Sequence, residues 1–252
     1  MTGAKRQVAG ISPRFFYALW LFSFCGVFSL AWAASPFVPS PGSVQASYDI
    51  YKSGVKVGQI VEIYKRDKDS YTLSSVTTPV GLLAMFKPEK IFIDSSGLIG
   101  KQGLQPLRFT HRRERDEMKG SQAEFDWETR QLTLIHQTQR NKLTLPEGTQ
   151  DRLSAMYQFM FLALKPDAAL DFSMTNGSKL DSYHYAVTGN QKLKTPDGEV
   201  STFYLDSQAK AGESRTEIWL APSRNNLPYK MIITDADGGQ LIQILNRLDI
   251  KP

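Results

Sequence analysis

Residues Asp151–Leu164 read DRLSAMYQFMFLAL, and this stretch decides the predicted fold. Its apolar side chains recur at the three- and four-residue spacing of one helical face. They are Leu153, Met156, Tyr157, Met160, Phe161 and Leu164. Phe159 and Leu162 make the last turns apolar on the other side too, which indicates a buried end. Gly148, Thr149 and Asp151 suit a helix start and Lys165-Pro166 a stop, so the sequence predicts one buried helix at about 151–164.

The rest of the chain is typical of short strands separated by turns. Val44–Tyr51 and Val55–Tyr64 flank Lys52-Ser53-Gly54 as in a hairpin, and further turns such as Asp237-Gly238-Gly239 follow at regular spacing. Such spacing favours antiparallel pairing over βαβ units. We therefore predict a mainly β protein. Its curved antiparallel sheet, or open or half barrel, wraps around the helix in a single domain over residues 44–252.

Residues 1–34 have the three parts of a secretory signal peptide. Three basic residues and no acidic one accompany an apolar run from Phe15 to Leu30, and Ala31-Trp32-Ala33 supplies a small-residue cleavage site. The run is shorter than the ~20 residues that span a bilayer, which favours a cleaved leader over a membrane anchor. The sequence therefore predicts an exported, periplasmic protein with no membrane span after cleavage. Residues 35–43, SPFVPSPGS, are predicted to be an extended, poorly ordered lead-in.

Charge and cysteine content exclude several classes of protein. Without the three basic residues of the leader, the excess of basic over acidic residues falls from five to two. This small excess gives no support to a nucleic-acid partner. The one cysteine, Cys25, lies in the leader, so the mature chain has neither a disulfide framework nor a thiol nucleophile.

No motif assembles a catalytic or metal site. His111, His136 and His184 stand outside every local metal-ligand spacing, and Ser154 has no nucleophile elbow around it. The position of Ser154 near the polar start of the helix is explained by local capping or by solvent exposure. We predict no catalytic residue, no metal and no cofactor, and we rank an enzyme below the other classes of function.

A basic cluster surrounds the first histidine. It comprises Arg108, Arg112, Arg113 and Arg115 with His111. Acidic residues are interleaved, which favours a solvated hairpin end. A phosphate or headgroup contact is the alternative interpretation.

The segment Pro79–Lys87, PVGLLAMFK, is more apolar than an ordinary turn. One interpretation is a short helix or flap that closes one end of the core. The other is a mobile lid over a ligand cavity, because Met and Leu side chains adapt to apolar partners. The predicted ligand-binding residues are Leu82, Leu83, Met85, Phe86, Met156, Met160 and Phe161, so the site would lie between this segment and the helix.

Five segments together resemble an exported bacterial family called domain of unknown function 3108. They are YDIYKSGVKVGQ (Tyr48–Gln59), GLQPLRF (Gly103–Phe109), FDWETRQL (Phe125–Leu132), DRLSAMY (Asp151–Tyr157) and EIWLAPSRNNLPYKM (Glu217–Met231). Their order carries the resemblance. It implies secretion and a β-rich fold, and it supplies no activity and no site residues.

Two classes of function therefore stay open. The first is a module that binds or carries an apolar or amphipathic, lipid-like ligand, similar in outline to envelope lipoprotein carriers, an analogy at the level of the fold. The second is a structural or interaction protein of the cell envelope, with a packed core and a protein partner. A cavity beside the helix would favour the first class, and a filled core the second.

Overall fold

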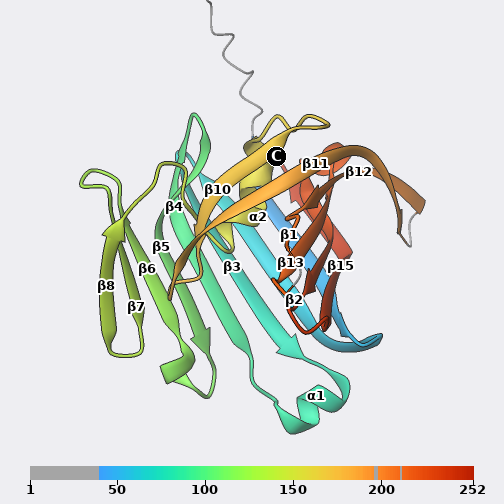
Figure 1. Cartoon of the computed structure of the whole chain (residues 1–252), viewed down its shortest axis with the longest axis horizontal. Helices are drawn as coiled ribbons and strands as arrows, with labels where there is room; N and C mark the ends of the chain where they lie inside the picture. Colours follow the sequence, from blue (N-terminus) through green and yellow to red (C-terminus); the bar gives the residue numbers. More distant parts are fainter. Residues whose placement is uncertain (1–39, 196–197, 211) are drawn as a thin grey trace, which may run out of the picture. The chain divides into compact units, whose positions relative to one another are not determined.

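The computed structural model describes residues 40–195, 198–210 and 212–252, all of which belong to one compact unit. The predicted signal peptide lies outside the described residues. One 15-stranded sheet runs through the unit in the order β8-β7-β6-β5-β4-β3-β2-β1-β15-β14-β13-β12-β11-β10-β9. Neighbouring strands are antiparallel, except that β9 and β10 are parallel. The sheet curves strongly without closing its ladder, as predicted (Figure 1).

The first eight strands are β1 (Ser43–Lys52), β2 (Val55–Asp67), β3 (Ser70–Pro79), β4 (Ile91–Gly100), β5 (Gly103–Arg113), β6 (Ser121–Asp126), β7 (Gln131–His136) and β8 (Gln139–Thr144). The others are β9 (Gln150–Asp151), β10 (Ala169–Thr175), β11 (Leu180–Thr195), β12 (Gly198–Asp206), β13 (Arg215–Ala221), β14 (Leu227–Thr234) and β15 (Gln240–Lys251). The helices are α1 (Gly81–Phe86) and α2 (Ser154–Gln158), with 3-10 turns η1 (Glu117–Lys119), η2 (Phe159–Phe161) and η3 (Pro222–Arg224).

Side-chain alternation along the strands assigns one face of the sheet to the core. In β1, Val44, Ala46, Tyr48 and Ile50 are buried, and the residues between them are more exposed. This period of two is what a half-buried strand requires. The buried face is concave, and α2 lies against it (Figure 1).

The helix is buried as predicted, but the predicted length is wrong. Residue Asp151 belongs to β9, the α-helix covers five residues, and η2 continues it for one 3-10 turn. The Asp151 carboxylate accepts hydrogen bonds from the backbone N–H groups of Leu153 and Ser154, at 2.9 and 2.8 Å, which fixes the start. At the other end, the Asn226 side chain donates to the carbonyls of Phe159 and Leu162. These caps end the helix before its apolar periodicity ends.

The α2–η2 segment joins two hydrophobic clusters. Tyr157 and Met160 belong to the cluster formed mainly by β1–β7, where Tyr157 stacks on Tyr64 with ring centroids 5.8 Å apart. Phe159 belongs to the cluster of β11–β13. Met156 contacts both clusters. The segment therefore fills the space between the two halves of the sheet.

The last residues of the predicted lead-in contact β2. Ser40 is buried, and its carbonyl accepts a hydrogen bond from the Arg66 guanidinium at 3.0 Å. The backbone N–H of Arg66 also donates to the carbonyl of Gly42. The chain therefore docks on β2 just before β1 begins.

Candidate functional site

An open cleft of about 850 Å3 lies between the β4–β5 turn, η2 and β10. Its apolar wall consists of Leu104, Trp127, Phe159, Phe161, Leu162, Leu170 and Phe172. Lys101, Gln105, Glu147 and Asp171 add polar groups. A mainly apolar cleft with a few polar groups is the usual form of a small-molecule site, and its volume is in the usual range of about 300–1,000 Å3.

Gln158 of α2 fixes the geometry of the cleft. Its Oε1 accepts a hydrogen bond from the backbone N–H of Leu104 at 2.7 Å, and its Nε2 donates to the carbonyl of Gln102 at 2.7 Å. The β4–β5 turn can approach this closely because Gly103 has a φ of +103° and no side chain. A Cβ at Gly103 would lie 2.4 Å from Gln158 Oε1 and 2.8 Å from the Cβ of Phe161. The turn and the helix therefore form one rigid wall.

Gln150 adds an unsatisfied acceptor beneath the wall. Its Nε2 donates to the carbonyl of Leu104 at 2.9 Å. Its Oε1 is buried and has no hydrogen-bond partner within the described part of the chain. Buried polar atoms are rarely left unpaired, so an internal water is the natural donor to this oxygen.

The structure separates the two groups of predicted ligand-binding residues. Phe161 lines the cleft, Met160 is buried in the core, and Met156 is half-buried between the two clusters. Leu82, Leu83, Met85 and Phe86 lie on α1, which packs against β2 and β3 at the opposite end of the sheet from α2 (Figure 1). The two groups therefore do not share a pocket.

The segment around α1 is a short helix, as one interpretation had it, but it does not close the core. None of its six residues is buried. Its large apolar side chains face solvent, and none of them belongs to the core cluster beneath α2.

Two buried carboxyl groups lie near α2, and sequence reasoning did not single out either as a site. Burial raises the pKa of Glu62 to about 7, while hydrogen bonds from Tyr157 and Ser75 oppose the rise. Burial also raises the pKa of Asp151, which accepts a hydrogen bond from Ser95 Oγ at 2.5 Å. Neither residue lines the cleft. A polar residue in the period-two pattern of β2, where Glu62 takes a core position, is the signal that could have identified it.

The serine and histidine candidates have local structural partners. Ser154 is fully buried, and its Oγ accepts a hydrogen bond from the backbone N–H of Asp151 at 3.0 Å, as capping predicts. His184 pairs with Asp171 at 2.6 Å on the surface, and His136 contacts the carbonyl of Gly120. Burial, followed by the positive charges of Arg152 and Arg113, lowers the pKa of His111. Within the described ranges, no three metal-ligating side chains come together.

The basic cluster of β5 is divided among separate contacts. Arg113 forms an ion pair with Glu89 at 3.2 Å, and the Arg112 guanidinium lies 5.0 Å from the centre of the Phe92 ring. Arg108 lies on a smaller cleft of about 370 Å3 over β2–β5. These arginines do not converge on one anion site.

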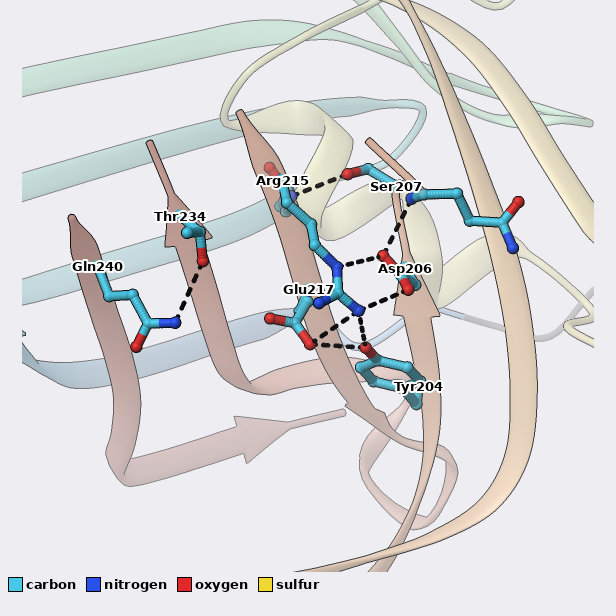
Figure 2. A network of polar contacts seen from close by, with 9 residues as sticks. Tyr204, Asp206, Ser207, Arg215, Glu217, Thr234 and Gln240 are labelled. Atoms are coloured by element: carbon cyan, nitrogen blue, oxygen red, sulfur yellow. Dashed lines mark hydrogen bonds and ion pairs between the residues drawn. The ribbon is translucent and has the colours of Figure 1, made fainter. Parts of the chain in front are cut away.

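A second polar cluster lies on β12 and β13, and its charged groups pair with one another. Figure 2 shows Arg215 between Tyr204, Asp206 and Glu217 of the neighbouring strands β12 and β13. Arg215 donates to both carboxylate oxygens of Asp206, at 2.9 and 2.7 Å, and this pairing lowers the pKa of Asp206. The Tyr204 hydroxyl donates to Glu217 at 2.6 Å. Because each charged group has a partner, the cluster clamps the β12–β13 connection and leaves no charge free for a ligand.

Fold and cleft together define an unclosed, strongly curved β-sheet protein with one short helix against its concave face. The chain belongs to the family described as "Protein of unknown function (DUF3108)", whose model matches residues 47–244. No curated protein sequence matches the chain.

Among solved structures, a β-barrel-like protein of the domain of unknown function DUF1849 from Brucella abortus is similar, with a TM-score of 0.54 and 14% identity. The match covers 84% of this chain and 99% of that one, and it shows the fold alone. A candidate exported protein from Bacteroides fragilis with a YmcC-like fold matches at a TM-score of 0.36 and 11% identity, over 84% and 98% of the chains. A likeness at this TM-score supports no conclusion about this chain.

No helix in the described ranges is long and apolar enough to cross a membrane.

Proposed function

We propose that this protein is an exported protein of the cell envelope that binds an apolar or amphipathic small molecule in the cleft beside η2. The observation that carries the proposal is the cleft of about 850 Å3, with aromatic and aliphatic side chains along one wall. Water in contact with such a wall is displaced favourably by an apolar ligand. Half-buried Phe161 and Leu162 supply surface that a ligand would cover.

The polar groups of the cleft favour an amphipathic ligand over a pure hydrocarbon. Lys101 and Asp171 lie on its lining, where they can meet a polar head of either charge. A lipid-like molecule with a polar head fits this pattern.

The proposed export is supported by the predicted signal peptide and not by the cleft. The basic start, the apolar run and the small-residue site of residues 1–34 support a cleaved signal peptide and a periplasmic location. Detection of an intact Met1 on protein isolated from its native cells would contradict this part of the proposal.

The second candidate is a structural or interaction protein of the envelope. The observation that favours it is the filled core beneath α2, where Tyr157 and Met160 are buried. Under this alternative the cleft binds no small molecule and the outer surface serves a protein partner.

A fluorescent fatty-acid probe distinguishes the two candidates. Wild-type protein should bind the probe, and Ala163→Trp, at an exposed position on the lining, should block binding by filling the cleft without lowering the melting temperature. Phe161→Ser should weaken binding by tenfold or more, as expected for about 1.5–3 kcal/mol of lost apolar contact.

Leu83→Ser is the matched control, because it removes a similar apolar side chain from α1, far from the cleft. Its affinity for the probe should equal that of wild type. A wild-type protein that takes up no probe would support the structural candidate, and equal binding by wild type and Ala163→Trp would exclude the cleft as the site.

A further inference from the structure

A compact apolar tip projects from the end of the sheet opposite the cleft. In α1, Leu82, Leu83, Met85 and Phe86 are 70%, 38%, 76% and 80% exposed. Val55, at the start of β2, is 59% exposed and belongs to the hairpin beside α1. We call these five residues the apolar tip. Nearly half of the exposed large apolar residues in the described chain therefore lie in this one place.

The backbone holds the apolar tip in a defined position. The N–H of Val80 donates to the carbonyl of Val57 at 3.0 Å, and the N–H of Lys87 donates to the carbonyl of Leu83 at 2.8 Å. The first bond ties the start of α1 to β2, and the second closes its last turn. The apolar side chains are thus presented outward by an ordered element.

Lysines flank the tip on both sides. Lys52 lies on the β1–β2 hairpin, and Lys87 and Lys90 follow α1. All three are exposed, and none forms an ion pair with another described residue. Two nearby acids form ion pairs, Asp49 with Lys56 at 2.7 Å and Glu89 with Arg113 at 3.2 Å. A third acid, exposed Glu114, accepts a hydrogen bond from the backbone N–H of Lys90 at 3.2 Å. The three lysines outnumber this one carboxylate, so the charge around the tip is positive on balance.

We propose that the apolar tip and Lys52, Lys87 and Lys90 dock on the surface of a phospholipid bilayer that carries anionic headgroups. Apolar side chains with basic neighbours are the pattern by which proteins lie on such a surface. A protein partner fits less well, because standard interfaces bury about 800 Å2 on each side, more than a projecting six-residue helix offers. A fluid lipid surface needs no complementary shape.

Vesicle flotation tests the proposal. Purified protein should float with vesicles made of one part phosphatidylglycerol to two parts phosphatidylcholine, and it should bind pure phosphatidylcholine vesicles more weakly. Leu82→Asp with Phe86→Asp should reduce partitioning by tenfold or more, because two large side chains no longer insert. Lys87→Gln with Lys90→Gln should reduce it about thirtyfold on anionic vesicles, at about 1 kcal/mol per lysine, and hardly at all on neutral ones.

Leu98→Asp is the control. Leu98 is 44% exposed on β4, seven residues beyond the α1-proximal end of that strand, so its replacement changes exposed apolar area without touching the tip. It should float like wild type. Absence of wild-type binding to anionic vesicles, or equal losses for Leu98→Asp and the tip variant, would overturn the proposal. Self-association through the tip would also overturn the proposal. It would appear as a dimer in sedimentation that Leu82→Asp abolishes, together with no binding of the wild type to vesicles.

The fatty-acid probe and the vesicle assay report on opposite ends of the sheet. Ala163→Trp should lose probe binding and keep vesicle binding. The variant with Leu82→Asp and Phe86→Asp should keep probe binding and lose vesicle binding. Failure of one assay therefore leaves the other proposal standing.

Discussion

Replacing Glu62 by glutamine should make the protein more stable at neutral and alkaline pH. Glu62 is 7% exposed, and burial raises its pKa from an ordinary value of 4.5 to about 7. Between these values the folded chain holds a proton that the unfolded chain has released. The contribution of Glu62 to the free energy of unfolding is therefore fully present below pH 4.5 and is lost as the pH rises to about 7. Each pKa unit corresponds to about 1.4 kcal/mol, so the loss is about 3 kcal/mol.

Glutamine should keep the local hydrogen bonds while removing the charge. Tyr157 donates to Glu62 Oε2 at 3.1 Å and Ser75 donates to Oε1 at 3.4 Å. Either hydroxyl can rotate to accept from an amide nitrogen. The variant should therefore match wild type near pH 4 and exceed its free energy of unfolding by up to about 3 kcal/mol at pH 8.

Urea denaturation followed by circular dichroism at several pH values measures this difference. The stability of the variant should still fall slightly with pH, because the pKa of buried Asp151 is raised as well. Glu128→Gln is the control, since that carboxylate is exposed and forms no hydrogen bond with the described residues. Parallel pH profiles for wild type and Glu62→Gln would refute the reasoning.

Two further predictions concern the contacts of the α2–η2 segment. Met160→Asp places an unpaired carboxylate in the core, where Met160 is 4% exposed, and should lower the free energy of unfolding by about 3 kcal/mol or more, measured as a shift in the denaturation midpoint. Gly103→Ala should lower it by about 1–3 kcal/mol, because its methyl group would collide with Gln158 and Phe161 at a backbone φ that favours glycine. Gly148→Ala, at a φ of +70° with no heavy atom within 4 Å of the added methyl, controls for the backbone effect alone.

Periodicity predicted most of the architecture, because each strand of the sheet buries one face. The hairpin of β1 and β2 was expected from the turn residues between two alternating segments. Strand β8 was not expected as an element of its own, because all its residues, QRNKLT, are exposed and carry no apolar alternation. β8 lies at the edge of the sheet, where a strand can pair with one neighbour and expose all its side chains. No local sequence pattern indicates this edge position.

The site was predicted less well because it depends on contacts between distant residues. Gln158 connects α2 to a turn more than 50 positions earlier in the chain. The apolar Pro79–Lys87 segment was recognised as unusual, but its distance from α2 follows from the length of β3, which leads to the far end of the sheet. No local sequence pattern indicates the contacts of Gln158 or the distance between α1 and α2.

The pairing of β1 with β15 has a consequence for how the chain folds. This ladder runs from Ser43↔Lys251 to Lys52↔Leu241 in the middle of the sheet, and Asn246 donates to Asp49 across 197 positions. Strands β2–β8 and β11–β14 can each form from neighbouring hairpins. Joining the two arrays closes the longest loop in the chain, which is the step with the largest entropic cost. The seam at β1–β15 should therefore form late, after synthesis has passed the last strand, and the half-sheets that precede it carry open edges on which chaperones can act.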